Sequence, residues 1–317
     1  MSQLMNSEEI GNATQILKSG GLVAVPTETV YGLAADATND HAVARIFEAK
    51  GRPTFNPLIA HVTGIAMAGQ HVDFSPLAQT LAHAFWPGAL TLVLPRKARS
   101  EISHLATAGL DTVAVRAPDH AVTQALLDTF GRPVVAPSAN RSGSISPTTA
   151  AHVAGGLGEQ VDGIIDGGPC RIGLESTIVK IDGDKAQLLR PGGIARSEIE
   201  RIAGRLAIAP RDQAILAPGM LSSHYAPGAK VRLNIRTPMT TEAFLAFGPA
   251  ENSAKTNNLS VSGDLTEAAA NLFSHLRALD KICADLGLDG IAVAPIPEIG
   301  LGEAINDRLR RAAAPAD

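Results

Sequence analysis

The chain has 317 residues, so two domains are expected, each long enough to bury a core of its own. Hydrophobic residues at 45% and charged residues at 18% are ordinary for a globular protein and exclude a disordered or fibrous class. The net charge is −4, with 17 basic and 19 acidic residues up to residue 205 and 10 basic against 12 acidic residues after it, which argues against a basic nucleic-acid scaffold. The aromatic content of 3% argues against stacking platforms for single-stranded nucleic acid.

Over the first two hundred residues, short β-branched runs alternate with amphipathic stretches, which is the pattern of an α/β domain. The predicted strands, in chain order, are Leu22–Val25, Leu58–Val62, Ala89–Leu94, Thr112–Arg116, Pro133–Ala136, Gly163–Ile165, Ser176–Ile181 and Gln187–Leu189. Polar N-caps and prolines in the first turn predict helix starts at Ser7, Asn39, Ser75-Pro76, Asp119, Ser146-Pro147 and Ser197, the last forming a capping box with Glu200.

Glycine and proline break the periodicity between about Gly204 and Gly228. Residues 206–229 are therefore predicted to link a first domain, residues 1–205, to a smaller α/β unit, residues 230–317. The linker contains His224 and Tyr225, and a loop of this length with such residues is more often functional than a passive tether. Beyond it we expect strands at Lys230–Ile235, Ala243–Phe247 and Gly290–Ala294, a helix at Leu265–Leu286, a C-terminal helix, and a mobile polar loop at Glu251–Asn258.

Two cysteines, Cys170 and Cys283, lie far apart in the sequence, which indicates neither a disulfide framework nor a structural zinc site and favours a reducing compartment. The first ten residues carry Glu8 and Glu9 and no apolar core of signal-peptide length. No stretch approaches the ~20 apolar residues that a membrane helix needs. We therefore expect a cytoplasmic protein without a membrane partner.

The first polar cluster runs from Pro26 to Leu33, with the sequence PTETVYGL. It follows a predicted strand directly and holds hydroxyl groups between a proline and a glycine. Loops at strand ends often line pockets in α/β proteins. A simple hydrogen-bonded turn accounts for the same residues equally well, so both interpretations remain open here.

The second cluster is Lys50-Gly51-Arg52-Pro53, at the end of a helical stretch. Two cations that flank a glycine can converge on an anion, because arginine offers a planar fork and lysine a point charge. Spacing alone favours the alternative in which Lys50 only satisfies the helix C-terminus. For His61, in the next predicted strand, the sequence likewise favours a core histidine with satisfied hydrogen bonds over a ligand-binding residue.

The third cluster, Pro137 to Gly143, follows a strand and precedes the predicted helix start at Ser146-Pro147. Hydroxyl, amide and free backbone N–H groups ahead of a helix can form a phosphate or nucleotide cradle, although Ser and Asn in a turn need no function. The sequence has no Walker-type phosphate loop, no dinucleotide Gly-x-Gly-x-x-Gly opening a helix, no zinc His-Glu-x-x-His and no Gly-x-Ser-x-Gly elbow. A bound nucleotide would therefore occupy a less common cradle.

Together and in this order, the clusters are more specific than any one of them. The chain resembles the two-domain members of the YrdC-like family, the threonylcarbamoyl-AMP synthases, in which a YrdC-like domain is followed by a linker and a small C-terminal domain. The resemblance covers nearly the whole chain and rests on Pro26–Leu33, Lys50–His61, Trp86-Pro87-Gly88 with Thr91, Ser138–Pro147, Asp166–Val179, Leu189–Gly193, Pro218–Pro227, Gly300-Leu301-Gly302 and Asn306-Asp307-Arg308. Leu221 departs from it, because many relatives are expected to have a basic residue there.

The resemblance implies a twisted, mixed-sheet α/β domain similar to double-stranded-RNA-binding folds, followed by a smaller Rossmann-like α/β domain. It implies condensation of L-threonine, bicarbonate or CO2, and ATP to threonylcarbamoyl-AMP and pyrophosphate, with Mg²⁺ accompanying the nucleotide. The product would serve N6-threonylcarbamoyladenosine modification of tRNA. It would pass to a threonylcarbamoyl transferase complex, so tRNA is expected to be an indirect partner.

The resemblance also implies roles for particular residues. The implied threonine contacts are Thr29, His61, Arg116, Ser176 and the backbone near Ala136. The implied ATP contacts are Arg52, Asn56, Thr112, Ser138, Asn140, Ser146, Arg190 and Tyr225. Lys50 and Arg52 are the expected catalytic cations, because a reaction that joins carboxylates and a triphosphate needs converging cations more than an acid–base pair. No protein ligand for Mg²⁺ and no general base are assigned.

Two other functions remain open. One is an RNA-binding module, disfavoured by the absence of net positive charge; the other is carbamoyl transfer of the hydrogenase-maturation type, whose proteins carry zinc-binding and acylphosphatase-like modules that have no counterpart here. A further hypothesis makes the linker a lid, because Tyr225 lies between Gly-containing stretches and a reactive mixed anhydride must be shielded from water.

Overall fold

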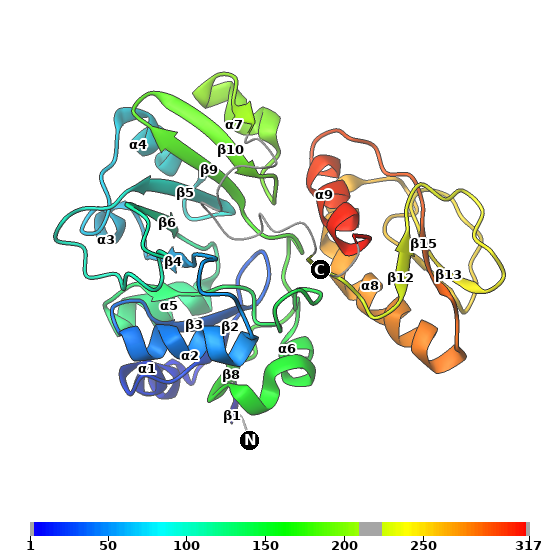
Figure 1. Cartoon of the computed structure of the whole chain (residues 1–317), viewed down its shortest axis with the longest axis horizontal. Coiled ribbons are helices and arrows are strands. Elements are labelled where there is room, and N and C mark those ends of the chain that lie inside the picture. Colours follow the sequence, from blue (N-terminus) through cyan, green and yellow to red (C-terminus); the bar gives the residue numbers. More distant parts are fainter. Residues whose placement is uncertain (1–2, 209–223, 315–317) are drawn as a thin grey trace.

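The computed structural model describes residues 3–208 and 224–314, which form two lobes (Figure 1). The larger lobe contains the N-terminal residues, and the smaller one contains the C-terminal strands and helices. The predicted linker, residues 206–229, is thus described only at its two ends. Within the described ranges, no helix is long and apolar enough to span a bilayer.

The larger lobe is built on one mixed sheet. Its strands are β1 (Gln3–Met5), β2 (Val23–Val25), β3 (Gly32–Asp36), β4 (Ile59–His61), β5 (Leu90–Pro95), β6 (Thr112–Arg116), β7 (Val134–Val135), β8 (Gly163–Ile165), β9 (Thr177–Asp182), β10 (Lys185–Arg190) and β11 (Ala207–Ile208). The order across this 11-stranded sheet is β1-β8-β2-β3-β7-β4-β6-β5-β9-β10-β11. Strands β2, β4 and β8 are buried along their whole length, which is why they are short apolar runs without alternation.

Helices cover this sheet. They are α1 (Ile10–Lys18), α2 (Asp40–Lys50), α3 (Ile65–Ala68), α4 (Pro76–Phe85), α5 (Ala121–Phe130), α6 (Ala150–Leu157), the 3₁₀ helix η1 (Gly158–Gln160) and α7 (Arg196–Ala203). In Figure 1, α1, α2 and α5 lie together beside β2 and β3, whereas α4 and α7 lie together near β9 and β10. The amphipathic helices bury their apolar faces against the sheet, which leaves the strand ends to form the site.

The smaller lobe has a four-stranded sheet in which every pairing is parallel. Its strands are β12 (Lys230–Arg232), β13 (Glu242–Ala246), β14 (Thr256–Asn258) and β15 (Gly290–Val293), in the order β12-β15-β13-β14. Helix α8 (Leu265–Leu286) packs on β13 and β15, and α9 (Gly302–Ala312) packs on α8. The predicted α/β class and the large mixed sheet are confirmed, while the Rossmann-like description of this lobe stays a prediction.

All the predicted strands are present, with ends displaced by at most a few residues. Strands β1, β3, β11 and β14 were not predicted. The sequence of β3, GLAAD, has no β-branched residue, so its pairing with β2 and β7 is imposed by the sheet rather than by local propensity. The loop predicted at Glu251–Asn258 is wrong for its last residues, because Thr256–Asn258 form β14 against β13.

Two of the predicted helix starts are confirmed. The side chain of Asn39 accepts hydrogen bonds from the backbone of His41 and Ala42, and that of Ser75 accepts one from Ala78 at the start of α4. Four are wrong, because the N-caps are Glu9, His120, Thr149 and Ala195 instead of Ser7, Asp119, Ser146 and Ser197.

Competing contacts account for most of these errors. Asp119 forms an ion pair with Arg171 at 2.8 Å, and the hydroxyl of Ser146 donates to Glu175 at 2.5 Å. Glu200 accepts a hydrogen bond from the backbone of Leu206 instead of closing a capping box. Nothing in the structure explains why the N-cap of α1 is Glu9 instead of Ser7.

The two lobes share a hydrophobic core. Val30, Ile145 and Leu174 of the larger lobe are buried in the same cluster as the apolar residues of α8, α9, β13 and β15. Tyr225, at the C-terminal end of the predicted linker, belongs to it as well and stacks on Phe273 of α8 at 5.5 Å between ring centroids. The smaller lobe therefore packs directly against the loops that follow β2 and precede β9. The domain boundaries at residues 205 and 230 stay predictions.

Candidate functional site

A pocket lies where loops and strand ends of the larger lobe meet the C-terminal end of the predicted linker. It is lined by Thr29, Val30, Arg52, Ile59, His61, Arg116, Ala136, Pro137, Ser138, Glu175, Ser176, Arg190, His224 and Tyr225. Sheet register produces part of this convergence: β4 and β6 run parallel with His61 opposite Arg116, so both side chains come from the same strand ends. The pocket thus collects residues from most of the polar clusters in the sequence.

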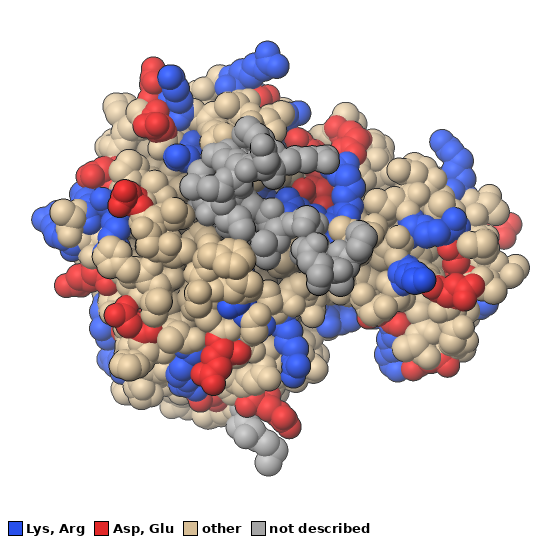
Figure 2. Space-filling view, viewed as in Figure 1, with Lys and Arg blue, Asp and Glu red and all other residues tan. Residues whose placement is uncertain are grey.

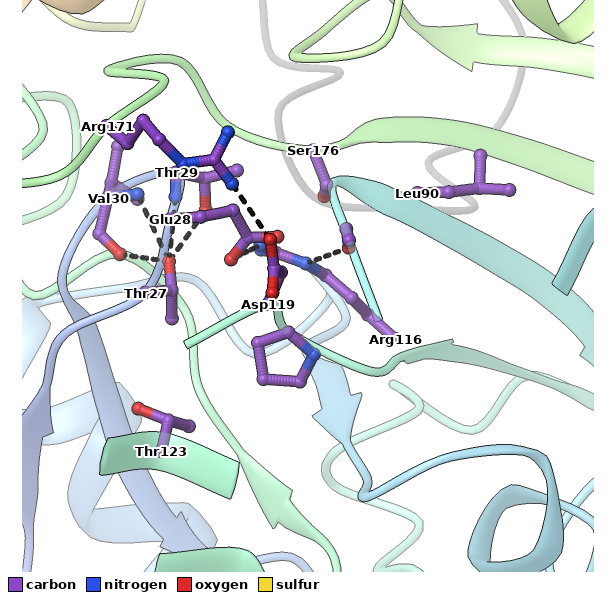
Figure 3. Close-up of polar contacts among 12 residues, drawn as sticks. Thr27, Glu28, Thr29, Val30, Leu90, Arg116, Asp119, Thr123, Arg171 and Ser176 are labelled. Atoms are coloured by element: carbon purple, nitrogen blue, oxygen red, sulfur yellow. Dashed lines mark hydrogen bonds and ion pairs between the residues drawn. The ribbon is translucent and has the colours of Figure 1, made fainter. Parts of the chain in front are cut away.

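The turn between β2 and β3 is fixed by Thr27 (Figure 3). The Thr27 hydroxyl donates to the Val30 carbonyl at 2.7 Å, accepts from the backbone N–H groups of Thr29 and Val30, and lies 2.8 Å from the Thr29 hydroxyl. Both interpretations of this cluster hold, because it is a hydrogen-bonded turn and it also presents Thr29 and Val30 to the pocket.

Arg116, at the end of β6, lines the pocket although it is 4% exposed. Its Nη2 lies 2.6 Å from Oε2 of Glu28, and its Nε donates to the carbonyl of Gly88 at 3.1 Å. Figure 3 shows the carboxylate of Glu28 directed at this guanidinium. The arginine is therefore held by two separate loops before any ligand arrives.

His61 is buried and also lines the pocket, so the core and pocket interpretations again coincide. Its Nδ1 lies 3.2 Å from the carbonyl of Ile59. Burial, and then the neighbouring positive charge of Arg116, lower the His61 pKa to about 3. The imidazole is therefore neutral at physiological pH and can exchange hydrogen bonds without adding charge.

Ser176 lies beside His61 and Arg116 on the pocket wall, at the start of β9. Its hydroxyl lies 2.7 Å from that of Thr91 on β5, a residue with no exposed surface. Arg190, from the end of β10, donates to the Ser176 carbonyl at 2.9 Å and to its hydroxyl at 3.3 Å. A cation and a hydroxyl of the pocket are thus joined directly.

Arg52 follows the left-handed C-cap Gly51 of α2. Its guanidinium donates to the Asn56 side chain at 2.7 Å and to the carbonyls of Asn56 and Pro57. Burial, and then the nearby charge of Arg190, lower the Arg52 pKa to about 10. It remains protonated at neutral pH, and its interaction with Arg190 means that two cations share this end of the pocket.

The sequence-based preference for Lys50 as a residue that only satisfies the helix C-terminus is wrong. Its ammonium does not satisfy the helix terminus; it donates at 2.6 Å to the carbonyls of Ser138 and Asn140. Burial, with the neighbouring charge of Arg52, lowers the Lys50 pKa. Lys50 is therefore not part of the pocket lining, but it fixes the loop that carries Ser138.

The third cluster is only partly at the pocket. Ser138 lines it, whereas the amide of Asn140 donates to the carbonyls of Arg141 and Ser144 and so closes the loop on itself. Because α6 begins at Ala150, the predicted helix start immediately after this cluster is absent.

Glu175 connects the pocket to the smaller lobe. Its Oε2 accepts from Nε of Arg308 on α9 at 2.8 Å, and its Oε1 accepts from Ser146. Burial alone would raise the Glu175 pKa, but Arg308 and Arg190, with the two hydrogen bonds, lower it to about 2. Arg308 has no exposed surface, and burial would lower its pKa, but Tyr225, Glu175 and Asp307 raise it.

His224 and Tyr225 close the pocket on the linker side. Tyr225 is 1% exposed, has a left-handed φ of 64°, and lies with its ring 5.2 Å from the Arg308 guanidinium. The following residue, Ala226, donates to the carbonyl of Gly143 at 2.8 Å, which ties this segment to the larger lobe. Burial lowers the His224 pKa to about 3, so this imidazole is also neutral.

Most of the sequence-predicted site residues reach the pocket. Those that line it are Thr29, Arg52, His61, Arg116, Ala136, Ser138, Ser176, Arg190 and Tyr225, and those that do not are Lys50, Asn56, Thr112, Asn140 and Ser146. Asn56 supports Arg52 from behind. Thr112 is four residues from Arg116 along β6, a separation of roughly 13 Å, so it lies away from this part of the site. The contacts predicted for these five residues stay predictions.

Glu28, Glu175 and Arg308 were not assigned roles from the sequence. Glu28 and Glu175 belong to quoted motifs, but nothing local indicates which arginine each would meet. The signal available for Arg308 was its place in Asn306-Asp307-Arg308 of a strongly amphipathic helix. In the described parts of the chain, no group of His, Cys, Asp and Glu is arranged to hold a metal ion.

Figure 2 shows basic and acidic side chains interspersed over the visible face. The lysines and arginines in this view do not form a continuous basic surface of the kind that tracks a nucleic-acid backbone. This agrees with the balanced charge of both halves of the sequence.

Two family models match the chain. One, described as telomere recombination, covers residues 15–192, and the other, described as threonylcarbamoyl-AMP synthase, C-terminal domain, covers residues 194–314. Together they span both lobes. The junction between them falls just before α7.

Curated and solved relatives match over almost the full length. The threonylcarbamoyl-AMP synthase of Bacillus subtilis is 40% identical, over 97% of this chain and 94% of that protein, and the one of Pyrococcus abyssi is 42% identical, over 95% and 92%. The crystal structure of Pyrococcus abyssi Sua5 complexed with L-threonine superposes with a TM-score of 0.89 at 38% identity, covering 99% of this chain and 97% of that one.

Proposed function

We propose, from the premise that the chain belongs to the threonylcarbamoyl-AMP synthase family, that it condenses L-threonine, bicarbonate or CO2, and ATP to threonylcarbamoyl-AMP and pyrophosphate. The observation that carries this proposal is one pocket that holds three arginines from separate elements, Arg52, Arg116 and Arg190. Positive charges that share one pocket repel one another, so such a cluster is suited to a ligand with several negative charges.

The proposed substrates divide this pocket between them. Threonine would contact Thr29, His61, Arg116, Ser176 and the backbone at Ala136, which line the pocket together. The nucleotide would contact Arg52, Ser138, Arg190 and Tyr225. Ser176 accepts from Arg190 and so lies at the boundary between the two groups. The apolar side chains of Val30 and Ile59, also on the wall, would exclude water from the reacting atoms.

The reaction class is nucleotidyl transfer. The threonine amine first takes up CO2 to form an N-carboxylate, and an oxygen of that carboxylate then attacks the α-phosphorus of ATP. One phosphorus–oxygen bond forms while the bond to the pyrophosphate leaving group breaks. Negative charge collects on the phosphoryl oxygens and the departing pyrophosphate, so preorganised Arg52 and Arg190 stabilise the transition state electrostatically.

Lys50 would contribute indirectly. Because its ammonium is bonded to the carbonyls of Ser138 and Asn140, it shapes the nucleotide-binding loop and adds positive potential behind it. Mg²⁺ would arrive on the ATP phosphates. It commonly keeps several waters and few protein ligands, and the described pocket wall supplies one carboxylate, that of Glu175, which is already bonded to Arg308 and Ser146.

The product suits transfer by a downstream threonylcarbamoyl transferase complex to adenosine in tRNA, so that tRNA would be an indirect partner. A cytoplasmic location follows from the sequence as a prediction.

We further propose that the linker acts as a lid, since Tyr225 forms part of the pocket wall and is joined to both lobes. Most of the lid segment lies outside the described residues. Neither the RNA-binding nor the hydrogenase-maturation alternative is favoured by the comparisons.

Pyrophosphate release tests the proposed function directly. The purified full chain should release pyrophosphate from ATP in bicarbonate buffer only when L-threonine is present, because the N-carboxylate of threonine is the nucleophile. Release at the same rate without threonine would contradict the proposal. Mass spectrometry of the product separates threonylcarbamoyl-AMP from simple ATP hydrolysis.

Replacing Arg52 tests the electrostatic argument. Arg52→Ala should lower the rate of adenylate synthesis by about 10²–10³, the usual cost of removing one preorganised electrostatic contact to the transition state. Arg171→Ala is the matched control, since Arg171 is exposed and its ion pair with Asp119 lies outside the pocket. Normal turnover by a folded Arg52→Ala chain would refute the role given to this residue.

A further inference from the structure

A buried carboxylate lies behind the pocket and has no part in the function proposed above. Glu28 is 2% exposed and is absent from the pocket wall, yet it follows Thr27 and precedes Thr29 in the turn that builds that wall. Its Oε2 lies 2.6 Å from Nη2 of Arg116. In Figure 3 the side chains of Glu28, in the turn after β2, and Arg116, at the end of β6, point toward each other.

Stability does not explain this ion pair. Transferring two charges from water to the protein interior carries a large desolvation cost, and a buried pair offsets that cost only when its remaining polar atoms are well bonded. Neither carboxylate oxygen of Glu28 accepts a hydrogen bond from any described residue beyond the close contact with Arg116. An apolar pair of the same volume would serve a purely structural purpose at least as well.

The geometry of Arg116 indicates what the pair does. Nε donates to the carbonyl of Gly88, and Nη2 faces Glu28. No described residue accepts a hydrogen bond from Nη1, although the side chain is 4% exposed and lines the pocket. A planar guanidinium held at two of its three nitrogens has its remaining nitrogen fixed in direction.

The position of Glu28 is itself tightly defined. Its carbonyl accepts a hydrogen bond from the backbone of Ile172 at 2.7 Å, and the hydroxyl of Thr27 holds the N–H groups of Thr29 and Val30. The same turn therefore presents Thr29 to the pocket and Glu28 to the back of Arg116. This single turn therefore determines both the position of Thr29 and the contact behind Arg116 at the amino-acid end of the site.

We propose that Glu28 is a positioning residue for the amino-acid substrate: it holds the Arg116 guanidinium so that Nη1 meets the substrate carboxylate. This inference rests on the proposed function, in which Arg116 contacts threonine. It adds a residue that touches neither substrate and acts only through the arginine. Preorganisation of this kind reduces the conformational entropy that the arginine would otherwise lose on binding.

A competing role for Glu28 predicts the opposite result. If the carboxylate served only as a countercharge, removing it would leave Arg116 more strongly positive, and the anionic carboxylate of threonine would bind more tightly. If Glu28 positions the arginine, removing its charge frees the guanidinium, and threonine binds more weakly. The sign of the change in affinity therefore separates the two roles.

Calorimetric titration of the full chain with L-threonine provides the test. Glu28→Gln should weaken threonine binding at least about tenfold, the usual effect of losing one well-placed hydrogen bond to a charged group. The dissociation constant of a non-hydrolysable ATP analogue should stay within about twofold, because Arg52 and Arg190 do not contact Glu28. In an Arg116→Ala background, Glu28→Gln should produce no further loss of threonine affinity.

A matched control is available in the smaller lobe. Glu242 is also buried and is bonded to an arginine, Arg232, at 2.6 Å, although that arginine is 47% exposed. Glu242→Gln therefore removes the partner of a buried glutamate away from the pocket and should leave threonine binding unchanged. If Glu28→Gln does not fold, Glu28→Asp carries the test. It keeps the negative charge but shortens the side chain by one methylene, so a positioning role predicts weaker binding here too.

Three outcomes would overturn the inference. They are wild-type or tighter threonine affinity in folded Glu28→Gln, equal losses of threonine and ATP-analogue affinity, and wild-type threonine affinity in Glu28→Asp. In each case the wild-type chain still binds threonine, so the proposed function stands. A wild-type chain that binds no threonine would instead overturn the proposed function, and the positioning role with it.

Discussion

At the scale of single residues, the pocket holds its histidines neutral. Burial lowers the pKa of His61 and of His224 to about 3, although each lies among charged side chains. Both are therefore suited to hydrogen bonding rather than to charge stabilisation. The positive charge of the site comes from arginines, whose guanidinium groups stay protonated even when buried.

The free energy of unfolding should fall as the pH is lowered from about 6.5 to 4.5. The folded-state pKa of His61 lies below its ordinary value of 6.5, so the unfolded chain binds a proton that the folded chain does not. A single such group contributes a slope of up to about 1.4 kcal/mol per pH unit. Urea denaturation at pH 7 and pH 5 measures it.

His61→Gln should reduce this slope without abolishing it, because His224 and His152 also have lowered pKa values and keep contributing. His83→Gln, at an exposed position on α4, should leave the slope as in the wild type. The same slope in His61→Gln and in the wild type would contradict the assignment of the effect to His61. Measurements at pH 7 and pH 5 stay above 4.5, the ordinary pKa at which the Glu175 carboxylate takes up a proton in the unfolded chain, so Glu175 contributes little to this slope.

A second residue-scale prediction concerns the hydroxyl pair on the pocket wall. Thr91→Val keeps the shape of the side chain but removes the partner of the Ser176 hydroxyl, 2.7 Å away. The KM for threonine should rise about fivefold, corresponding to one hydrogen bond of about 1 kcal/mol, with little change in the KM for ATP. Steady-state kinetics with each substrate varied in turn measure both.

Thr14→Val is the matched control for Thr91→Val. Thr14 is also a buried threonine, but its hydroxyl donates to the Ile10 carbonyl within α1, away from the pocket. An equal rise in both KM values for Thr91→Val would point to general disturbance of the site and against orientation of Ser176.

At the scale of elements, helix α8 determines how closely the lobes approach. Gly173, in the loop before β9, faces the backbone of this helix, and a Cβ atom built there would lie 2.5 Å from the carbonyl oxygen of Ala269. Its φ is +72°, so a side chain would be disfavoured by backbone conformation as well. The next residues in this loop are Leu174, which belongs to the core shared by the lobes, and Glu175, which lines the pocket.

Gly173→Ala should therefore lower the free energy of unfolding by more than the cost of placing an alanine in a left-handed backbone conformation. Gly183→Ala is the control, because its φ of +61° carries a similar conformational cost, about 1–2 kcal/mol, while no atom lies within 4 Å of the added Cβ. The difference between the two variants in urea denaturation isolates the steric term at α8. Equal losses of stability would mean that the helix can move away without cost.

At the scale of the whole molecule, the smaller lobe contributes a buried arginine that bonds Glu175, a residue of the pocket wall in the larger lobe. Arg308 of α9 bonds Glu175 at 2.8 Å and the Pro191 carbonyl at 3.0 Å, and it lies against the ring of Tyr225. These contacts tie α9, the loop before β9 and the end of the linker into one structure. Loss of the smaller lobe would expose the shared core and leave the Glu175 carboxylate without its arginine.

Arg308→Ala should reduce the free energy of unfolding by about 3–5 kcal/mol, because it leaves the Glu175 carboxylate buried without its partner. Arg310→Ala, two residues along the same helix but in an exposed ion pair with Glu298, should cost about 0–1 kcal/mol. Differential scanning calorimetry compares the two. Similar thermal stability of both variants would show that the buried network does not join the lobes.

Much of the secondary structure was determined locally. Buried strands such as β6 and β8, and the 22-residue helix α8, match their predicted ranges because periodicity and β-branched composition reflect each segment's own burial. Helix starts were predicted less well, since side chains such as Asp119 and Ser146 took partners distant in sequence. Strand β3, with no intrinsic strand preference, depended entirely on its neighbours.

The sequence by itself determined the α/β class, the order of the polar clusters and the identity of most side chains that line the pocket. Only the tertiary structure decided which of them face it: Lys50 turned to carbonyls of a loop 88 and 90 residues away, and Thr112 lay at the far end of its strand. The pair Glu28–Arg116 joins a turn to the end of β6, and the pair Glu175–Arg308 joins a loop of the larger lobe to α9 of the smaller one. Local patterns record the burial of a segment, whereas a long-range contact depends on how the whole sheet and both lobes come together.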